Sequence, residues 1–215
     1  MTPGDLVIGG TLSLEVRWIL PGSPDAAVTE WFDGFPSEVE SREDAYFLDP
    51  DMDRFSVKVR AGRLLEVKAF GGSPGILESG GRARGHLQYW RKWSVPFRPP
   101  SAGSCDPDGW KRVRKQRRTI RFSLTQGWIT APAGSLDGEP QCAVELTGIR
   151  VHHQDRWSHW WSLGLEATGP ADLLSPVLGA AAALVFTQPL LSGLDLDVQD
   201  STSYAEWLRR SRCRP

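Results

Sequence analysis

Apolar and charged residues alternate along several short stretches of the chain, and residues 54–70 (RFSVKVRAGRLLEVKAF) show the pattern in two adjoining stretches. Every second residue of each stretch is apolar, and the residues between them include Lys58, Arg60, Glu66 and Lys68. Successive side chains of a β-strand point to opposite faces of a sheet, so the pattern predicts two strands, each with one apolar and one charged face. The Ala-Gly pair between the strands predicts a tight turn.

The same alternation recurs along most of the chain. It predicts further strands at residues 11–19 (TLSLEVRWI), 43–48, 86–97, 119–124, 128–131, 141–151 and 160–168. A sheet that repeats this pattern and closes on itself encloses a charged lumen. Residues 71–85 are rich in Gly and Ser, which predicts a flexible connection. With helices expected at residues 23–35, 175–188 and 203–212, the fold class is α+β, mostly an antiparallel barrel with flanking helices.

Length and composition favour one globular domain. The chain has 215 residues, of which 40% are hydrophobic and 24% are charged, and a β-barrel of this length is commonly a single domain. We therefore expect one domain over residues 1–215, with barrel strands over about 11–169 and C-terminal helices over about 175–213. The net charge of -1 gives the whole molecule no attraction to nucleic acid or to a membrane surface, so any electrostatic function is local.

Cysteine usage and apolar segments bear on location. Cys105, Cys142 and Cys213 are widely spaced and lack a paired metal-ligand spacing, which is typical of free thiols in a reducing compartment. The first ten residues have no basic region followed by an apolar run, so no secretory signal is predicted. The apolar segment 178–186 is too short to span a bilayer. The sequence thus predicts a cytoplasmic protein with no membrane partner.

The charged faces of the expected strands hold more basic than acidic residues, although the chain is nearly neutral. These residues are Glu15, Arg17, Lys58, Arg60, Glu66, Lys68, Lys92, Arg117, Arg121, Glu145 and Glu166. Lys and Arg donate charge-assisted hydrogen bonds to phosphate oxygens, while carboxylates hold Mg²⁺ or Mn²⁺ together with substrate phosphates. Burying so many charges is costly without a ligand or water to solvate them, which favours a wet anion-binding tunnel over a purely structural network of ion pairs.

Several segments, in this order, resemble the CYTH superfamily, also called triphosphate tunnel metalloenzymes. They are an early ExExK-type strand, the string DAYFLDPDMDRFSVKVRAGRLLEVK, the segments YWRKWSVPF and KQRRTIRF, and the late pair CAVELTGIRV and WWSLGLEATG. The resemblance covers residues 11–169. It implies an eight-stranded antiparallel β tunnel that hydrolyses or cyclises triphosphates with a divalent metal.

The resemblance also assigns roles to individual residues. It implies that Glu15, Glu145 and Glu166 are catalytic residues and ligands of Mg²⁺ or Mn²⁺. The implied substrate-binding residues are Arg17, Lys58, Arg60, Lys68, Arg117 and Arg121. One position departs from the family pattern: the places of its two Glu and its Lys hold Ser13, Glu15 and Arg17, so one carboxylate expected to bind metal is absent. Whether Glu66 replaces that ligand or pairs with a neighbouring base stays open.

Two hypotheses of function follow. The first is a metal-dependent phosphohydrolase that acts on a small triphosphate compound, inorganic or organic, in a basic tunnel. The second, motivated by Ser13 and by the excess of basic residues, is a catalytically weak or inactive binding protein for polyphosphorylated ligands. Nucleic-acid binding is disfavoured, because only part of the basic run 111–118 (KRVRKQRR) continues into a strand face. The sequence leaves open whether the chain forms a homodimer.

Overall fold

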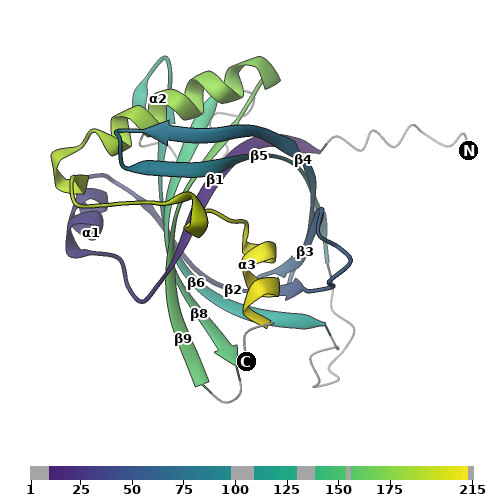
Figure 1. Ribbon diagram of the computed structural model, residues 1–215. Helices are drawn as coiled ribbons and strands as arrows, with labels where there is room; N and C mark the ends of the chain where they lie inside the picture. Colours follow the sequence, from purple (N-terminus) through teal and green to yellow (C-terminus); the bar gives the residue numbers. More distant parts are fainter. Residues whose placement is uncertain (1–9, 98–108, 130–138, 154–155, 213–215) are drawn as a thin grey trace, which may run out of the picture.

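The computed structural model describes residues 10–97, 109–129, 139–153 and 156–212. Its strands are β1 (Thr11–Pro21), β2 (Glu38–Phe47), β3 (Phe55–Arg60), β4 (Leu64–Ser79), β5 (Ala83–Pro96), β6 (Trp110–Ser123), β7 (Gly127–Ile129), β8 (Gln141–His153) and β9 (Arg156–Thr168). Eight of them pair antiparallel in the order β2-β3-β4-β5-β1-β9-β8-β6, and the pairing of β2 with β6 closes the ring (Figure 1). The short β7 pairs with the end of β6.

The expected eight-stranded antiparallel barrel with flanking helices is therefore confirmed. The α-helices are α1 (Ala26–Asp33), α2 (Leu174–Phe186) and α3 (Tyr204–Arg212). Figure 1 shows α2 against the outside of the barrel and α3 at the opening of the ring of strands.

Two hydrophobic cores hold these helices in place. The larger core lies between α2 and the outward-facing apolar row of the strands, where Leu14, Val144 and Leu165 are fully buried. Although α2 is apolar nearly all round, it buries one face against the strands, while Gly179, Ala183 and Leu184 on the opposite face are exposed. The smaller core lies at one end of the barrel, where Trp207 and Leu208 of α3 pack against the strands. The lumen is thus narrowed at that end by the C-terminal helix.

The hairpin formed by β3 and β4 has the predicted tight turn. Ala61 and Gly62 both adopt positive φ angles, 49° and 69°, as the central residues of a type I′ turn require. The Arg63 amide donates to the Arg60 carbonyl at 3.1 Å and closes the turn, and beyond Arg63 the strands pair with Arg60 opposite Leu64 and Lys58 opposite Glu66.

The prediction of a flexible connection over residues 71–85 is wrong. Strand β4 continues to Ser79 and pairs with β5, which begins at Ala83. Register shifts at Gly72 and Gly75 interrupt the pairing, and both glycines have positive φ angles, 115° and 135°. The glycines mark β-bulges within a long strand and not the end of that strand.

Three other strands begin several residues earlier than predicted, and one of them, β9, begins at Arg156 and not at residue 160. Strand β2 begins at Glu38, five residues before the predicted start, and β6 begins at Trp110, so the basic run 111–118 is entirely extended. Charged residues occupy both faces at the start of β6, and the outward face of β2 mixes apolar residues with Ser41 and Glu43, so neither segment shows the apolar alternation that marks the other strands.

No helix in the described part of the chain is long and apolar enough to cross a membrane. Cys142 is a free thiol, fully buried in the larger core. Cys105 and Cys213 lie outside the described residues.

Candidate functional site

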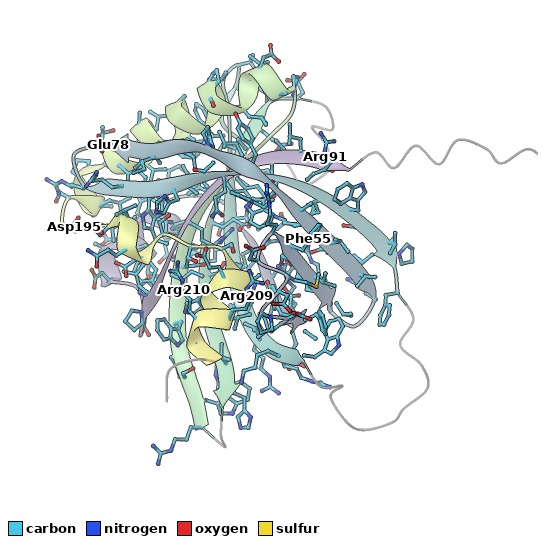
Figure 2. All side chains as sticks on the ribbon, turned by 45° about the vertical axis from the view of Figure 1, so that its right-hand side comes forward. Phe55, Glu78, Arg91, Asp195, Arg209 and Arg210 are labelled. Atoms are coloured by element: carbon cyan, nitrogen blue, oxygen red, sulfur yellow. The ribbon has the colours of Figure 1, made fainter. Side chains whose placement is uncertain are left out.

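The polar faces of the strands line a cavity inside the barrel. It has a volume of about 110 Å³. Its lining includes Glu15, Arg17, Arg42, Tyr46, Lys58, Arg60, Glu66, Lys68, Gln88, Trp90, Lys92, Lys115, Arg117, Glu145 and Glu166 from the strands, and residues 202–205 from the segment that begins α3. Figure 2 shows side-chain nitrogen and oxygen atoms gathered within the ring of strands behind α3.

The structure brings together all but one of the residues singled out from the sequence. Glu15, Glu145 and Glu166 line the cavity, as do Arg17, Lys58, Arg60, Lys68 and Arg117. Arg121 does not line it. Its guanidinium lies 3.4 Å from the carboxylate of Glu38, an exposed residue at the start of β2. Arg121 shares a strand face with Arg117 but lies beyond the cavity.

Glu145 lies between two arginines. Its Oε2 accepts a hydrogen bond of 2.8 Å from Arg17, and its Oε1 accepts one of 2.5 Å from Arg117. The side chains of Glu145 and Arg17 are only 6% and 9% exposed. Burial alone would raise the pKa of Glu145, but Arg117 and Arg17 outweigh it and hold that pKa well below its usual value. Both carboxylate oxygens of Glu145 are thus already bound by cations.

Lys68 bridges the other two carboxylates. Its Nζ donates to Glu15 Oε1 at 2.5 Å and lies 3.5 Å from Glu166 Oε1. Burial alone would lower the pKa of Lys68, but Glu15 and Glu166 raise it above its usual value, so the amine is charged. Ser13 donates a hydrogen bond of 2.7 Å to the same oxygen, Glu15 Oε1. The serine that stands in place of a family carboxylate thus acts as a hydrogen-bond donor to its neighbour.

Glu66 pairs with neighbouring bases, which answers the question left open by the sequence. Its two oxygens lie 2.8 Å from Lys58 Nζ and 3.2 Å from Arg60 Nη1. Burial opposes the charge on Glu66, but Lys58 and Arg60 lower its pKa to about 2. Both carboxylate oxygens of Glu66 are thus already paired with bases of β3.

Sequence reasoning missed a buried group centred on Asp44. This residue is fully buried and contacts Arg42, Lys58 and Lys115. Burial raises its pKa, but Lys58, Lys115 and Arg42 bring it down to about 2. The sequence does contain the pattern, because Arg42, Asp44 and Tyr46 occupy every second position of β2 and so share one face of that strand. The prediction started the strand at residue 43, which left Arg42 out of it.

Lys115 was also missed, because it lies inside the basic run. Lys115 and Arg117 face the lumen, whereas Arg112 and Arg114 on the outer surface pair with Glu43. The Nζ of Lys115 donates to the Tyr46 hydroxyl at 2.6 Å and lies 3.3 Å from the centre of the Tyr204 ring.

Burial of Lys115, reinforced by the positive charges of Lys58, Arg42 and Arg17, holds its pKa well below the usual value even though Asp44 opposes the shift. A buried amine that titrates in a lumen of paired charges can take up or release a proton when an anion enters. Lys115 thus differs from Lys68, the pKa of which is raised by its carboxylate partners.

The three predicted metal ligands, as they are paired here, do not fit a divalent cation. Mg²⁺ requires oxygen ligands with free lone pairs around one centre. Both oxygens of Glu145 accept from arginines, and the ammonium of Lys68 lies between Glu15 and Glu166. In the described part of the chain, no three His, Cys, Asp or Glu side chains are arranged to hold a metal ion. The expected Mg²⁺ or Mn²⁺ stays a prediction, and we derive no chemical step through it.

Comparison with known proteins gives no family assignment. No family model and no curated protein matches the chain. Among solved structures, a conserved hypothetical protein from Pyrococcus furiosus is similar at 16% identity and a TM-score of 0.42, over 89% of this chain and 98% of that one. The putative adenylyl cyclase HpAC1 from Hippeastrum, described as revealing a dominant triphosphatase activity, is similar at 10% identity and a TM-score of 0.43, over 94% and 97%.

At these TM-scores the two likenesses carry no weight for function. The barrel itself rests on the strand pairing of this chain, and a closed ring of eight antiparallel strands around a charged lumen fits the tunnel expected from the resemblance to the CYTH superfamily.

Proposed function

We propose that the tunnel binds a small triphosphate compound through its basic side chains. One observation carries the proposal: eight basic side chains converge on a cavity that is lined by only four carboxylates. Two further carboxylates, Glu40 and Asp44, contact these bases, which still leaves positive charge in surplus in a protein of net charge -1. Such a concentration of Lys and Arg favours a compact polyanion, whose oxygens accept charge-assisted hydrogen bonds.

The dimensions of the lumen support a short phosphate chain as the ligand. The cavity of about 110 Å³ is too small for a strand of nucleic acid. A second cavity of about 920 Å³ lies beside α3 and shares Gln88, Trp90 and Ser203 with the first. The two cavities therefore adjoin each other at these residues.

Lys92 offers the cleanest test of binding. It lines the lumen and forms no ion pair in the described part of the chain, so its removal deletes a ligand contact without breaking a salt bridge. Arg91, the next residue along β5, is exposed and provides a matched control. Calorimetry with tripolyphosphate in the presence of EDTA should show binding to the wild-type protein.

Lys92→Ala should weaken this binding about 10- to 100-fold, since a hydrogen bond to a charged group contributes about 1.5–3 kcal/mol. Arg91→Ala should bind like the wild type. The absence of tripolyphosphate binding to the wild type, or an equal loss in both variants, would contradict the proposal.

Hydrolysis of the bound triphosphate is a second candidate, and it is favoured by Lys115. A lysine with a lowered pKa beside the lumen can accept a proton from an attacking water, which is the task of a general base. Release of phosphate from tripolyphosphate and nucleoside triphosphates, measured with Mg²⁺, with Mn²⁺ and with EDTA, tests this activity and its metal dependence. Lys115→Met should abolish the release while tripolyphosphate still binds. Release that is unchanged in this variant would exclude Lys115 as the base.

A further inference from the structure

Two lumen carboxylates lie side by side on neighbouring strands. Glu15 of β1 and Glu166 of β9 are register partners, so their side chains emerge at the same level of the barrel wall. Like charges that face each other across a strand pair repel, and a cation between the two groups relieves that repulsion. Here the cation is the ammonium of Lys68, which reaches them from β4 at 2.5 Å and 3.5 Å.

We infer that Lys68 is the built-in cation of this tunnel: its ammonium occupies the position between Glu15 and Glu166 that a divalent metal would need. The tunnel accordingly binds its anionic ligand without a metal, and this second statement rests on the function proposed above.

Ser13 explains why one lysine is enough to neutralise the carboxylates of this cluster. Its hydroxyl donates to Glu15 Oε1, the same oxygen that accepts from Lys68. A hydroxyl that donates to a carboxylate consumes a lone pair and adds no negative charge. The cluster therefore holds two carboxylates and not three, and a single positive charge placed between two carboxylates stabilises both of them.

The surrounding charges also disfavour a divalent ion. Arg17 acts electrostatically on Glu15, and Lys92 acts on Glu166. Two carboxylates thus already face three cations when Lys68 is in place. A metal ion that joined them would add two positive charges to a site with a positive surplus, and a metal that displaced Lys68 would leave a buried ammonium without its partners.

The test is a titration of the protein with Mn²⁺ alone, followed by electron paramagnetic resonance of the free ion. Wild-type protein should show no saturable binding. Lys68→Met keeps the length of the side chain and removes its charge, so Glu15 and Glu166 become available, and this variant should gain one saturable Mn²⁺ site. Lys68→Met combined with Glu166→Gln should lose the gained site again.

Lys92→Met is the matched control, because it removes a lumen ammonium that forms no ion pair among the described residues. It should gain no Mn²⁺ site. If Lys68→Met fails to fold, as judged by circular dichroism, Lys68→Gln takes its place, since its amide retains a hydrogen-bond donor without charge.

Saturable Mn²⁺ binding to the wild-type protein overturns the inference, and so does a Lys68 variant that folds but gains no site. The titration contains no phosphate compound, so its outcome is independent of whether the tunnel binds triphosphates. Tripolyphosphate binding by the wild type in EDTA then tests the second statement separately: binding only after a divalent metal is added would refute metal-free binding and leave the proposed ligand class standing.

Discussion

Replacement of Glu145 by glutamine should destabilise the protein strongly, because it leaves the buried Arg17 without its ion-pair partner and removes one of the two carboxylates that pair with Arg117. Glu145 is 6% exposed and accepts from Arg17, which is 9% exposed, and from Arg117, which is 21% exposed. Removing one partner of a buried ion pair costs about 3–5 kcal/mol, most of which is the penalty of an uncompensated buried charge. The amide oxygen that the substitution introduces still accepts a hydrogen bond, so we expect a loss near the lower end, about 3 kcal/mol.

Glu43→Gln is the matched control. Glu43 also pairs with two arginines, Arg112 and Arg114, but on the outer surface, where all three side chains are between 36% and 58% exposed. Exposed ion pairs contribute about 0–1 kcal/mol, so this variant should be nearly as stable as the wild type. Urea unfolding followed by tryptophan fluorescence, with ten tryptophans in the chain, measures both free energies of unfolding.

Tripolyphosphate should restore part of the stability that Glu145→Gln loses. An anion in the lumen supplies negative charge to Arg17, which the substitution leaves without an ion-pair partner, and to Arg117, which keeps Glu40. The ligand should therefore raise the urea midpoint of Glu145→Gln more than that of the wild type. Equal losses of stability in Glu145→Gln and Glu43→Gln would refute the reasoning, since the burial of the lumen pairs would then have no energetic consequence.

Three further outcomes are expected. The pKa of Lys115 lies well below its usual value, and an anion nearby raises it, so calorimetry of tripolyphosphate binding in buffers of different ionisation enthalpy should show proton uptake that Lys115→Met abolishes. Asp44 and Glu66 have pKa values of about 2 in the folded protein, below their unfolded values near 4. Their contribution to the free energy of unfolding is therefore complete above about pH 4.5 and is lost as the pH falls toward 2. In acid unfolding, Asp44→Asn should lack most of the pH-dependent loss of stability that Asp44 causes in the wild type. Ser13→Glu in the Lys68→Met background should bind Mn²⁺ more tightly than Lys68→Met alone, as measured by the same resonance titration, because a third carboxylate joins the other two.

The alternation of polar and apolar residues was enough to predict the barrel and most of its lumen. The pattern succeeds where one face of a strand packs against a core, as Leu14 and Leu165 do beneath α2, because burial then forces every second residue to be apolar. It fails in β2 and at the start of β6, because the face opposite the lumen there carries polar residues and not only apolar ones: Ser41 and Glu43 in β2, Arg112 and Arg114 in β6. Asp44 and Lys115 were missed for this reason.

The sequence could not predict which charged side chains of the lumen form ion pairs with one another. Glu145 and Glu166 occupy the same kind of position in the pattern, but one accepts from two arginines and the other lies beside Lys68. The difference depends on the order of the strands in the sheet: β6, which carries Arg117, lies beside β8, whereas Lys68 reaches Glu166 from β4, three strands away from β9. The position of Arg121 could not be predicted either. Its strand face was predicted correctly, but its place along the strand puts it beyond the cavity.

Ser13 and Lys68 are best understood together. From the sequence, Ser13 is a missing carboxylate and Lys68 is one more base for phosphate. In the structure both donate to a single oxygen of Glu15, and Lys68 also neutralises Glu166. A tunnel with a third carboxylate at position 13 would need more positive charge than one ammonium supplies, whereas with serine the charges at this level are balanced by the chain itself. This balance is the basis of our inference that Lys68 stands where a metal would be needed, and we propose that the basic side chains left without full compensation bind a polyanion.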